Sequence, residues 1–187
     1  MDVARYGDWT TPGYTQQKVM ENYGRRFQIS FPNEELPAGR PLYTSPIHER
    51  LTEENAVWGA SYGLESALWF QEKGKEPIED VTFKRSNAFD LVGEEVRAVR
   101  EKVGLMETTG FAKHEFSGSG AREFLDNLVT NRVPSAGRLT LAPMLNDKGM
   151  LIGDFTIATL ADPFNGEERF LVFGSGTLKA TFTGTCP

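Results

Sequence analysis

The chain has 187 residues, a length that suits one domain or one domain and part of a second. Hydrophobic residues make up 39% of the chain and charged residues 25%, which is the balance of a folded protein and excludes a disordered one. The formal net charge of −6 argues against nucleic acid as a partner. No run of about 18 apolar residues predicts a membrane-spanning helix.

The ends of the chain bear on its expected location. The single cysteine, Cys186, excludes a disulfide within the chain and suits a reducing compartment. Residues 1–9 carry three charged side chains and no apolar stretch, so they do not resemble a signal peptide. We therefore expect a cytoplasmic protein, or one of the mitochondrial matrix if the source is eukaryotic.

The N-terminal half is predicted to hold short elements between loops. Thr15 is a candidate cap for a helix that carries Val19, Met20 and Tyr23 and ends at Gly24. The further elements expected here are a strand over residues 27–31, a proline-rich loop over 33–46, a short helix over 46–55 and an exposed loop over 71–82.

Two amphipathic helices are predicted next. The first has Asn87 as its N-cap and Gly104 as its stop, and its apolar face consists of Val92, Val96, Val99 and Val103. The second follows Ser119 or Gly120 and ends near Asn131, and its apolar face consists of Ala121, Phe124, Leu125, Leu128 and Val129. A strand is expected between the two helices, over residues 113–116.

The C-terminal part is predicted to be an antiparallel sheet. Strands over 139–145 and 151–160 flank turn chemistry at 146–149, and a second turn at 162–166 leads to a central strand over 170–173. In the second of these strands, Phe155, Ile157 and Thr159 alternate with Asp154, Thr156 and Ala158, which places the two sets on opposite faces. Helices packed on a hairpin-connected sheet define an α+β fold.

Most motifs that carry chemistry are absent. The glycines at 117–120 lack the third glycine of a dinucleotide-binding fingerprint, so we interpret them as a tight turn and a helix cap, with an anion site at the helix N-terminus as the less favoured alternative. His48 and His114 are the only histidines, and neither has metal-ligand spacing, so no metal site is predicted. His114 is expected to face solvent from its short strand.

An ordered series of segments resembles a known family. The segments are Tyr6-Gly7-Asp8-Trp9-Thr10, Glu21-Asn22-Tyr23-Gly24, Pro32-Asn33-Glu34-Glu35, Ala38-Gly39-Arg40-Pro41, Ser45-Pro46-Ile47-His48-Glu49-Arg50-Leu51, Gly63-Leu64-Glu65, Trp69-Phe70, Phe83-Lys84-Arg85-Ser86-Asn87, residues 94–104, Phe111-Ala112-Lys113 and Leu145-Asn146-Asp147-Lys148-Gly149. Together they resemble the dimethylglycine and sarcosine dehydrogenase group. Residues 1–44 are similar to the linking segment that follows the flavin domain there. Residues 45–176 are similar to the N-terminal part of the folate-binding domain shared with the glycine-cleavage T-protein.

This resemblance implies a partial T-protein-like folate-binding fold, with tetrahydrofolate as the cofactor. The flavin domain of the family has no counterpart in these residues, so no FAD is expected in this chain. Residues 177–187 do not resemble the family, and we expect a chain truncated at its C-terminal side. A flavin-bearing chain or a C-terminal chain would then be a partner.

The resemblance also implies the site residues. Asp154 matches the folate-site aspartate of the family, whose carboxylate would position the folate amine and help to move its proton. The family usually has a second acidic residue or small residues next to this aspartate, and this chain has Ile152-Gly153 there. Gly153 weakens any claim of paired carboxylates. Leu171 and Phe173 correspond roughly to pterin-pocket residues, and Glu65 and Trp69 lie where the folate domain begins. Ordinary packing in the core is the alternative role for Leu171, Phe173 and Trp69.

Three interpretations of function remain open at this point. The first is the tetrahydrofolate-binding, one-carbon-transfer portion of an amine-oxidising enzyme. The second is a non-catalytic remnant or regulatory module of the same family, and the third is a subunit that completes its pocket with another chain. A strand edge and an apolar face left without later strands would favour self-association.

Overall fold

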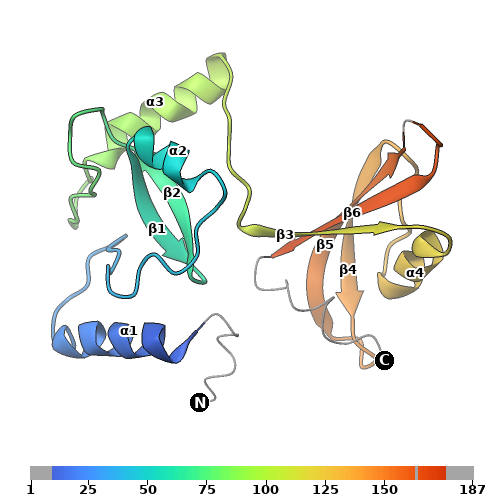
Figure 1. Cartoon of the computed structure of the whole chain (residues 1–187), viewed down its shortest axis with the longest axis horizontal. Helices are drawn as coiled ribbons and strands as arrows, with labels where there is room; N and C mark the ends of the chain where they lie inside the picture. Colours follow the sequence, from blue (N-terminus) through green and yellow to red (C-terminus); the bar gives the residue numbers. More distant parts are fainter. Residues whose placement is uncertain (1–9, 163, 176–187) are drawn as a thin grey trace. The chain divides into compact units, whose positions relative to one another are not determined.

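The computed structural model describes residues 10–162 and 164–175. The chain divides into two compact units, Met1–Glu107 and Thr108–Pro187 (Figure 1). No helix in the described ranges is long and apolar enough to cross a bilayer.

The N-terminal unit contains a two-stranded hairpin and three helices among its described residues. Its elements are α1 (Pro12–Gly24), α2 (His48–Glu53), β1 (Ala56–Ser61), β2 (Leu64–Phe70) and α3 (Ala88–Glu101). Helix α1 begins one turn before the predicted cap, because the side chain of Thr11 accepts a hydrogen bond from the Tyr14 N–H at 3.3 Å and Pro12 suits the first helical position.

The hairpin of β1 and β2 was not predicted from the sequence. Its turn has Tyr62 at φ 50° and Gly63 at φ 79°, the positive values that suit a two-residue hairpin loop. Tyr43 extends the hairpin by a single parallel bridge to Leu64. The outer backbone N–H groups of Ala60 and Phe70 donate to carboxylates of other segments, which protects the hairpin edges from pairing with another chain.

The strand predicted over residues 27–31 is wrong. Phe27 ends a turn, Gln28 lies in a bend and residues 29–31 have no regular secondary structure, and Phe27 and Ile29 are 94% and 78% exposed. An alternating pattern produces a strand only where one face is buried against a partner, and neither residue is buried.

Helix α3 forms as predicted, but it differs in its cap and its face. The Asn87 side chain does not cap the helix, because it accepts from the Asp80 N–H and donates to the Ile78 carbonyl. Of the helix side chains, Ala88 and Leu91 pack against the hairpin at Val57 and Trp69. The predicted apolar face is exposed, from 37% at Val92 to 89% at Val103.

The C-terminal unit is a four-stranded antiparallel sheet with one helix. Its elements are β3 (Phe111–Ser117), α4 (Ala121–Leu128), β4 (Arg138–Leu145), β5 (Leu151–Ala161) and β6 (Glu168–Ser175). The strand order is β3-β6-β5-β4, so the central position predicted for the last strand is confirmed (Figure 1). The predicted α+β class is confirmed as well.

The core of this unit lies between α4 and one face of the sheet. Its buried members are Ala121, Leu125, Val133, Ala142, Met144, Phe155, Ile157, Phe170 and Val172. Arg122 fastens the helix to β6, because its guanidinium donates to both carboxylate oxygens of Glu168 at 2.8 and 2.7 Å. This hydrogen bonding lowers the pKa of the Glu168 carboxyl below its usual value.

The turn chemistry of this unit agrees with the sequence. The Asn146 side chain accepts from the N–H groups of Lys148 and Met150, and the N–H groups of Phe164 and Asn165 donate to Asp162. These backbone donors lower the pKa of the Asp162 carboxyl. The expectation that His114 faces solvent is wrong, because it pairs in register with the buried Val172 and is half-buried.

Candidate functional site

The face of the C-terminal sheet opposite α4 holds the main candidate site, and we call it the open face. On β5 the residues Phe155, Ile157 and Thr159 are buried, so Asp154, Thr156 and Ala158 point to the other side, as predicted. In the register of the sheet, Thr156 is opposite Phe173 and Ala158 is opposite Leu171. Three residues predicted for the site, Asp154, Leu171 and Phe173, therefore share the open face.

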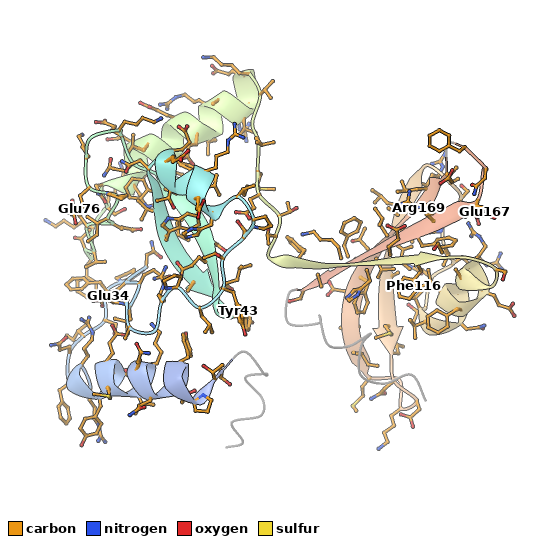
Figure 2. The ribbon with its side chains drawn as sticks, viewed as in Figure 1. Glu34, Tyr43, Glu76, Phe116, Glu167 and Arg169 are labelled. Atoms are coloured by element: carbon orange, nitrogen blue, oxygen red, sulfur yellow. The ribbon has the colours of Figure 1, made fainter. Side chains whose placement is uncertain are left out.

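The open face carries exposed apolar side chains. Phe111, Leu139 and Leu141 are 57%, 70% and 56% exposed, and they lie on β3 and β4 at the two sides of the sheet. Strand β3 adds charged groups to this face, because Lys113 is opposite Phe173 and Glu115 is opposite Leu171, and Arg169 donates to Glu115 at 2.7 Å (Arg169 is labelled in Figure 2). Such a surface can accept the flat face of a planar ring system.

Asp154 supplies an acceptor at one end of the open face. It lies opposite Pro143, in the cross-strand row next to that of Thr156 and Leu141. Its side chain is exposed, and no described residue donates a hydrogen bond to it or pairs with its charge. A ligand that lies on the open face could therefore donate an N–H to this carboxylate.

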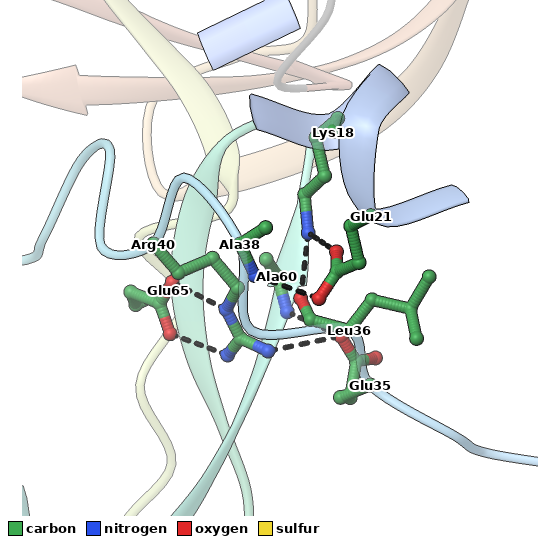
Figure 3. Close-up of polar contacts among 8 residues, drawn as sticks. All are labelled: Lys18, Glu21, Glu35, Leu36, Ala38, Arg40, Ala60 and Glu65. Atoms are coloured by element: carbon green, nitrogen blue, oxygen red, sulfur yellow. Dashed lines mark hydrogen bonds and ion pairs between the residues drawn. The ribbon is translucent and has the colours of Figure 1, made fainter. Parts of the chain in front are cut away.

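Glu65 and Trp69 lie in the N-terminal unit, so the structure groups them apart from Asp154. Glu65 is 4% exposed, and both of its carboxylate oxygens accept from Arg40, at 2.8 and 2.6 Å (Figure 3). Trp69 is 3% exposed, packs against Val57 and donates its indole N–H to Glu79 at 3.4 Å. These contacts give both side chains a structural role, and their cofactor-binding role stays a prediction.

The partner of Glu65 was not foreseen from the sequence. Arg40 was part of the family resemblance with no chemistry assigned, and 25 residues separate it from Glu65. The hydrogen bonds that the Arg40 guanidinium donates to Glu65 raise the pKa of Arg40, and Arg40 also pairs with Glu35 at 3.2 Å. No group of three His, Cys, Asp or Glu side chains among the described residues could hold a metal ion.

Fold and open face together define an antiparallel α+β domain whose open sheet face carries exposed apolar side chains and, in Asp154, a carboxylate that no described residue pairs with. Residues 47–181 match the family described as the GCVT N-terminal domain, and residues 1–45 match the one described as the FAD dependent oxidoreductase central domain. The chain therefore belongs to the GCVT N-terminal domain family. The T-protein-like fold expected from the sequence is consistent with this match.

Individual proteins that are similar in sequence support this family assignment. The chain is 33% identical over 178 residues to "Dimethylglycine dehydrogenase, mitochondrial" of Homo sapiens, which covers 95% of the chain and 20% of that protein. It is 33% identical over 174 residues to "4-methylaminobutanoate oxidase (formaldehyde-forming)" of Paenarthrobacter nicotinovorans, covering 92% and 20%. It is 29% identical over 114 residues to "Aminomethyltransferase" of Chloroherpeton thalassium, covering 60% and 30%.

The resemblance to the dimethylglycine and sarcosine dehydrogenase group is thus confirmed. The chain spans about a fifth of the length of the first two relatives.

Proposed function

We propose that the C-terminal unit contributes its open face to a tetrahydrofolate-binding site and takes part in the transfer of a one-carbon group. The observation that supports this most directly is the position of Asp154 on the open face, as an exposed carboxylate that no described residue pairs with. Leu171 and Phe173 on the same face would contact the flat ring system, and Asp154 would accept a hydrogen bond from one of its N–H groups.

In this proposal, the chemical role of the chain is to accept a proton from the folate amine. A bound tetrahydrofolate supplies the nitrogen that takes up the one-carbon unit, and this nitrogen must be neutral to react. Asp154 would hold that amine in place and accept the proton that it loses, which is the work of a general base within hydrogen-bond reach. We also propose that a methylated amine would be oxidised by a flavin-bearing partner or segment, and not by the residues of this chain.

Replacing Asp154 by Ala is expected to weaken the binding of tetrahydrofolate to the chain by roughly tenfold or more, because a hydrogen bond to a charged acceptor is lost. Isothermal titration calorimetry of the native chain and the variant measures the change. Asp147→Ala is the matched control, because this exposed aspartate lies in the β4–β5 turn. We expect it to bind within about twofold of the native chain.

Equal affinity of the native chain and Asp154→Ala would remove Asp154 from the site. Absence of saturable binding, at about millimolar ligand and with a native circular dichroism spectrum, would argue against the folate site. It would favour a regulatory module or a subunit that depends on another chain. For a eukaryotic source we propose a mitochondrial location, which the word "mitochondrial" in the name of the human relative supports.

A further inference from the structure

The N-terminal unit contains a cavity that the proposed function does not use. Its volume is about 350 Å³, near the lower end of the range of roughly 300–1,000 Å³ for small-molecule sites. It is lined by Asn33, Glu34, Glu35, Arg40, Val57, Trp58, Leu68, Pro77, Ile78, Glu79 and Val81. Residues 33–40 belong to the segment that matches one family and 57–81 to the segment that matches the other, so the cavity forms where the two segments meet.

A β-bulge shapes the apolar wall of this cavity. The register of β1 with β2 shifts between Val57 and Trp58. In a regular strand these neighbours would point to opposite faces, whereas here both line the cavity, together with Leu68. The ring of His48 stacks on Trp58, with ring centroids 4.1 Å apart, which helps to fix the orientation of the indole.

The three carboxylates of the lining are not equivalent. Glu34 pairs with Arg25, and Glu35 pairs with Arg40 at 3.2 Å. Glu79 accepts only from neutral donors, the Asn33 amide at 3.5 Å and the Trp69 indole N–H at 3.4 Å. In the part of the chain that the structure describes, no cationic side chain pairs with Glu79.

The positive charge of Arg40 does not neutralise the carboxylates around the cavity. Its guanidinium is shared between Glu35 and Glu65, so this group of three side chains carries a net negative charge. With the unpaired charge of Glu79 added, the cavity favours a cation over an anion or a neutral molecule. Among the described lining residues, Glu79 is the one carboxylate without a cationic partner, and several other lining side chains, such as Val57 and Leu68, are apolar. Both features suit an organic cation better than a metal ion, which needs several converging oxygen ligands.

We propose that this cavity binds an alkylammonium group. The ammonium donates to the carboxylate of Glu79, and the alkyl chain packs on Val57, Trp58 and Leu68. The face of an indole attracts a nearby cation, so Trp58 adds to the affinity. A free amine and the side chain of a lysine offer the same chemistry. This site lies in the other unit from Asp154 and is independent of the proposed folate site.

The proposal is tested by titrating the full chain with n-butylammonium chloride. Calorimetry and tryptophan fluorescence measure the binding. We expect saturable binding in the millimolar range, because the ligand has few atoms. Glu79→Gln keeps the shape of the side chain and removes its charge, and it is expected to weaken binding about tenfold. Glu76→Gln is the matched control with unchanged binding, since Glu76 is exposed and lies three residues earlier, outside the lining (Figure 2).

Two further ligands test whether binding needs the positive charge and which kind of ammonium group the site prefers. Neutral n-butanol should not compete, because it lacks the charge that Glu79 recognises. N-acetyl-lysine-amide distinguishes the sources, because a site built for a lysine side chain binds it more tightly than n-butylammonium, and a site for a free amine does the reverse. The proposal is overturned if the folded native chain shows no saturation at about 100 mM n-butylammonium. It is also overturned if folded Glu79→Gln binds as well as the native chain.

Discussion

Replacing Glu65 by Ala is expected to lower the free energy of unfolding of the N-terminal unit by about 3 kcal/mol, because it leaves the Arg40 guanidinium buried without its main partner. The Arg40 side chain is 12% exposed and that of Glu65 is 4% exposed, so water cannot replace the lost carboxylate fully. The two hydrogen bonds of 2.8 and 2.6 Å would both disappear (Figure 3).

Tryptophan fluorescence during urea unfolding measures this change selectively. Trp9, Trp58 and Trp69 are the three tryptophans of the chain, and all precede residue 108, where the C-terminal unit begins. Glu72→Ala is the matched control, since Glu72 pairs with Lys75 at the surface, with side chains 56% and 62% exposed. The loss of such a surface pair is expected to cost less than about 1 kcal/mol.

The double variant Arg40→Met with Glu65→Leu adds a second test. It removes both charges, so it should recover much of the stability that Glu65→Ala loses. If Glu65→Ala and Glu72→Ala had equal effects, the buried pair would contribute no more than a surface pair. Arg40 lies in the segment 1–45 and Glu65 in the segment 47–181, which match different families. The experiment therefore measures how strongly this pair stabilises the contact between the two segments.

The sequence predicted the C-terminal unit well for a physical reason. Its strands are amphipathic and joined by turns whose side chains bond their own backbone, such as Asn146 and Asp162. A period of two and a short turn fix which residues share a face. The common face of Asp154 and Phe173 then follows from the pairing of β5 with β6, which the sequence also indicated.

The structure of the N-terminal unit was harder to predict from the sequence. Its hairpin turns at Tyr62 and Gly63, without the Asn-Gly or Asp-Gly pair that marks such turns. Its structure depends on contacts between distant segments, such as the part-buried pair of Arg40 with Glu65 and the exposed hydrogen bond of Asn33 with Glu79. Local periodicity carries no information on such pairs. The cavity at Trp58 depends on a bulge, which breaks the alternation on which strand prediction relies.

The two faces of the C-terminal sheet should respond differently to the same substitution. Leu125→Ala is expected to lower the free energy of unfolding of this unit by about 3 kcal/mol, because Leu125 is fully buried between α4 and the sheet and its loss leaves a cavity. Leu141→Ala, on the open face with 56% of the residue exposed, should cost less than about 1 kcal/mol.

Amide hydrogen exchange on β5 and far-ultraviolet circular dichroism follow this unit, because residues 108–187 contain no tryptophan or tyrosine. Equal losses of stability for Leu125→Ala and Leu141→Ala would show that the open face is covered in solution. The proposed function adds an opposite expectation for ligand binding. Leu141 lies in the cross-strand row of Thr156 and Phe173, so Leu141→Ala should weaken tetrahydrofolate binding while the unit stays folded. Leu125→Ala, under conditions where the unit is still folded, should leave the affinity nearly unchanged, because its side chain packs on the other face of the sheet.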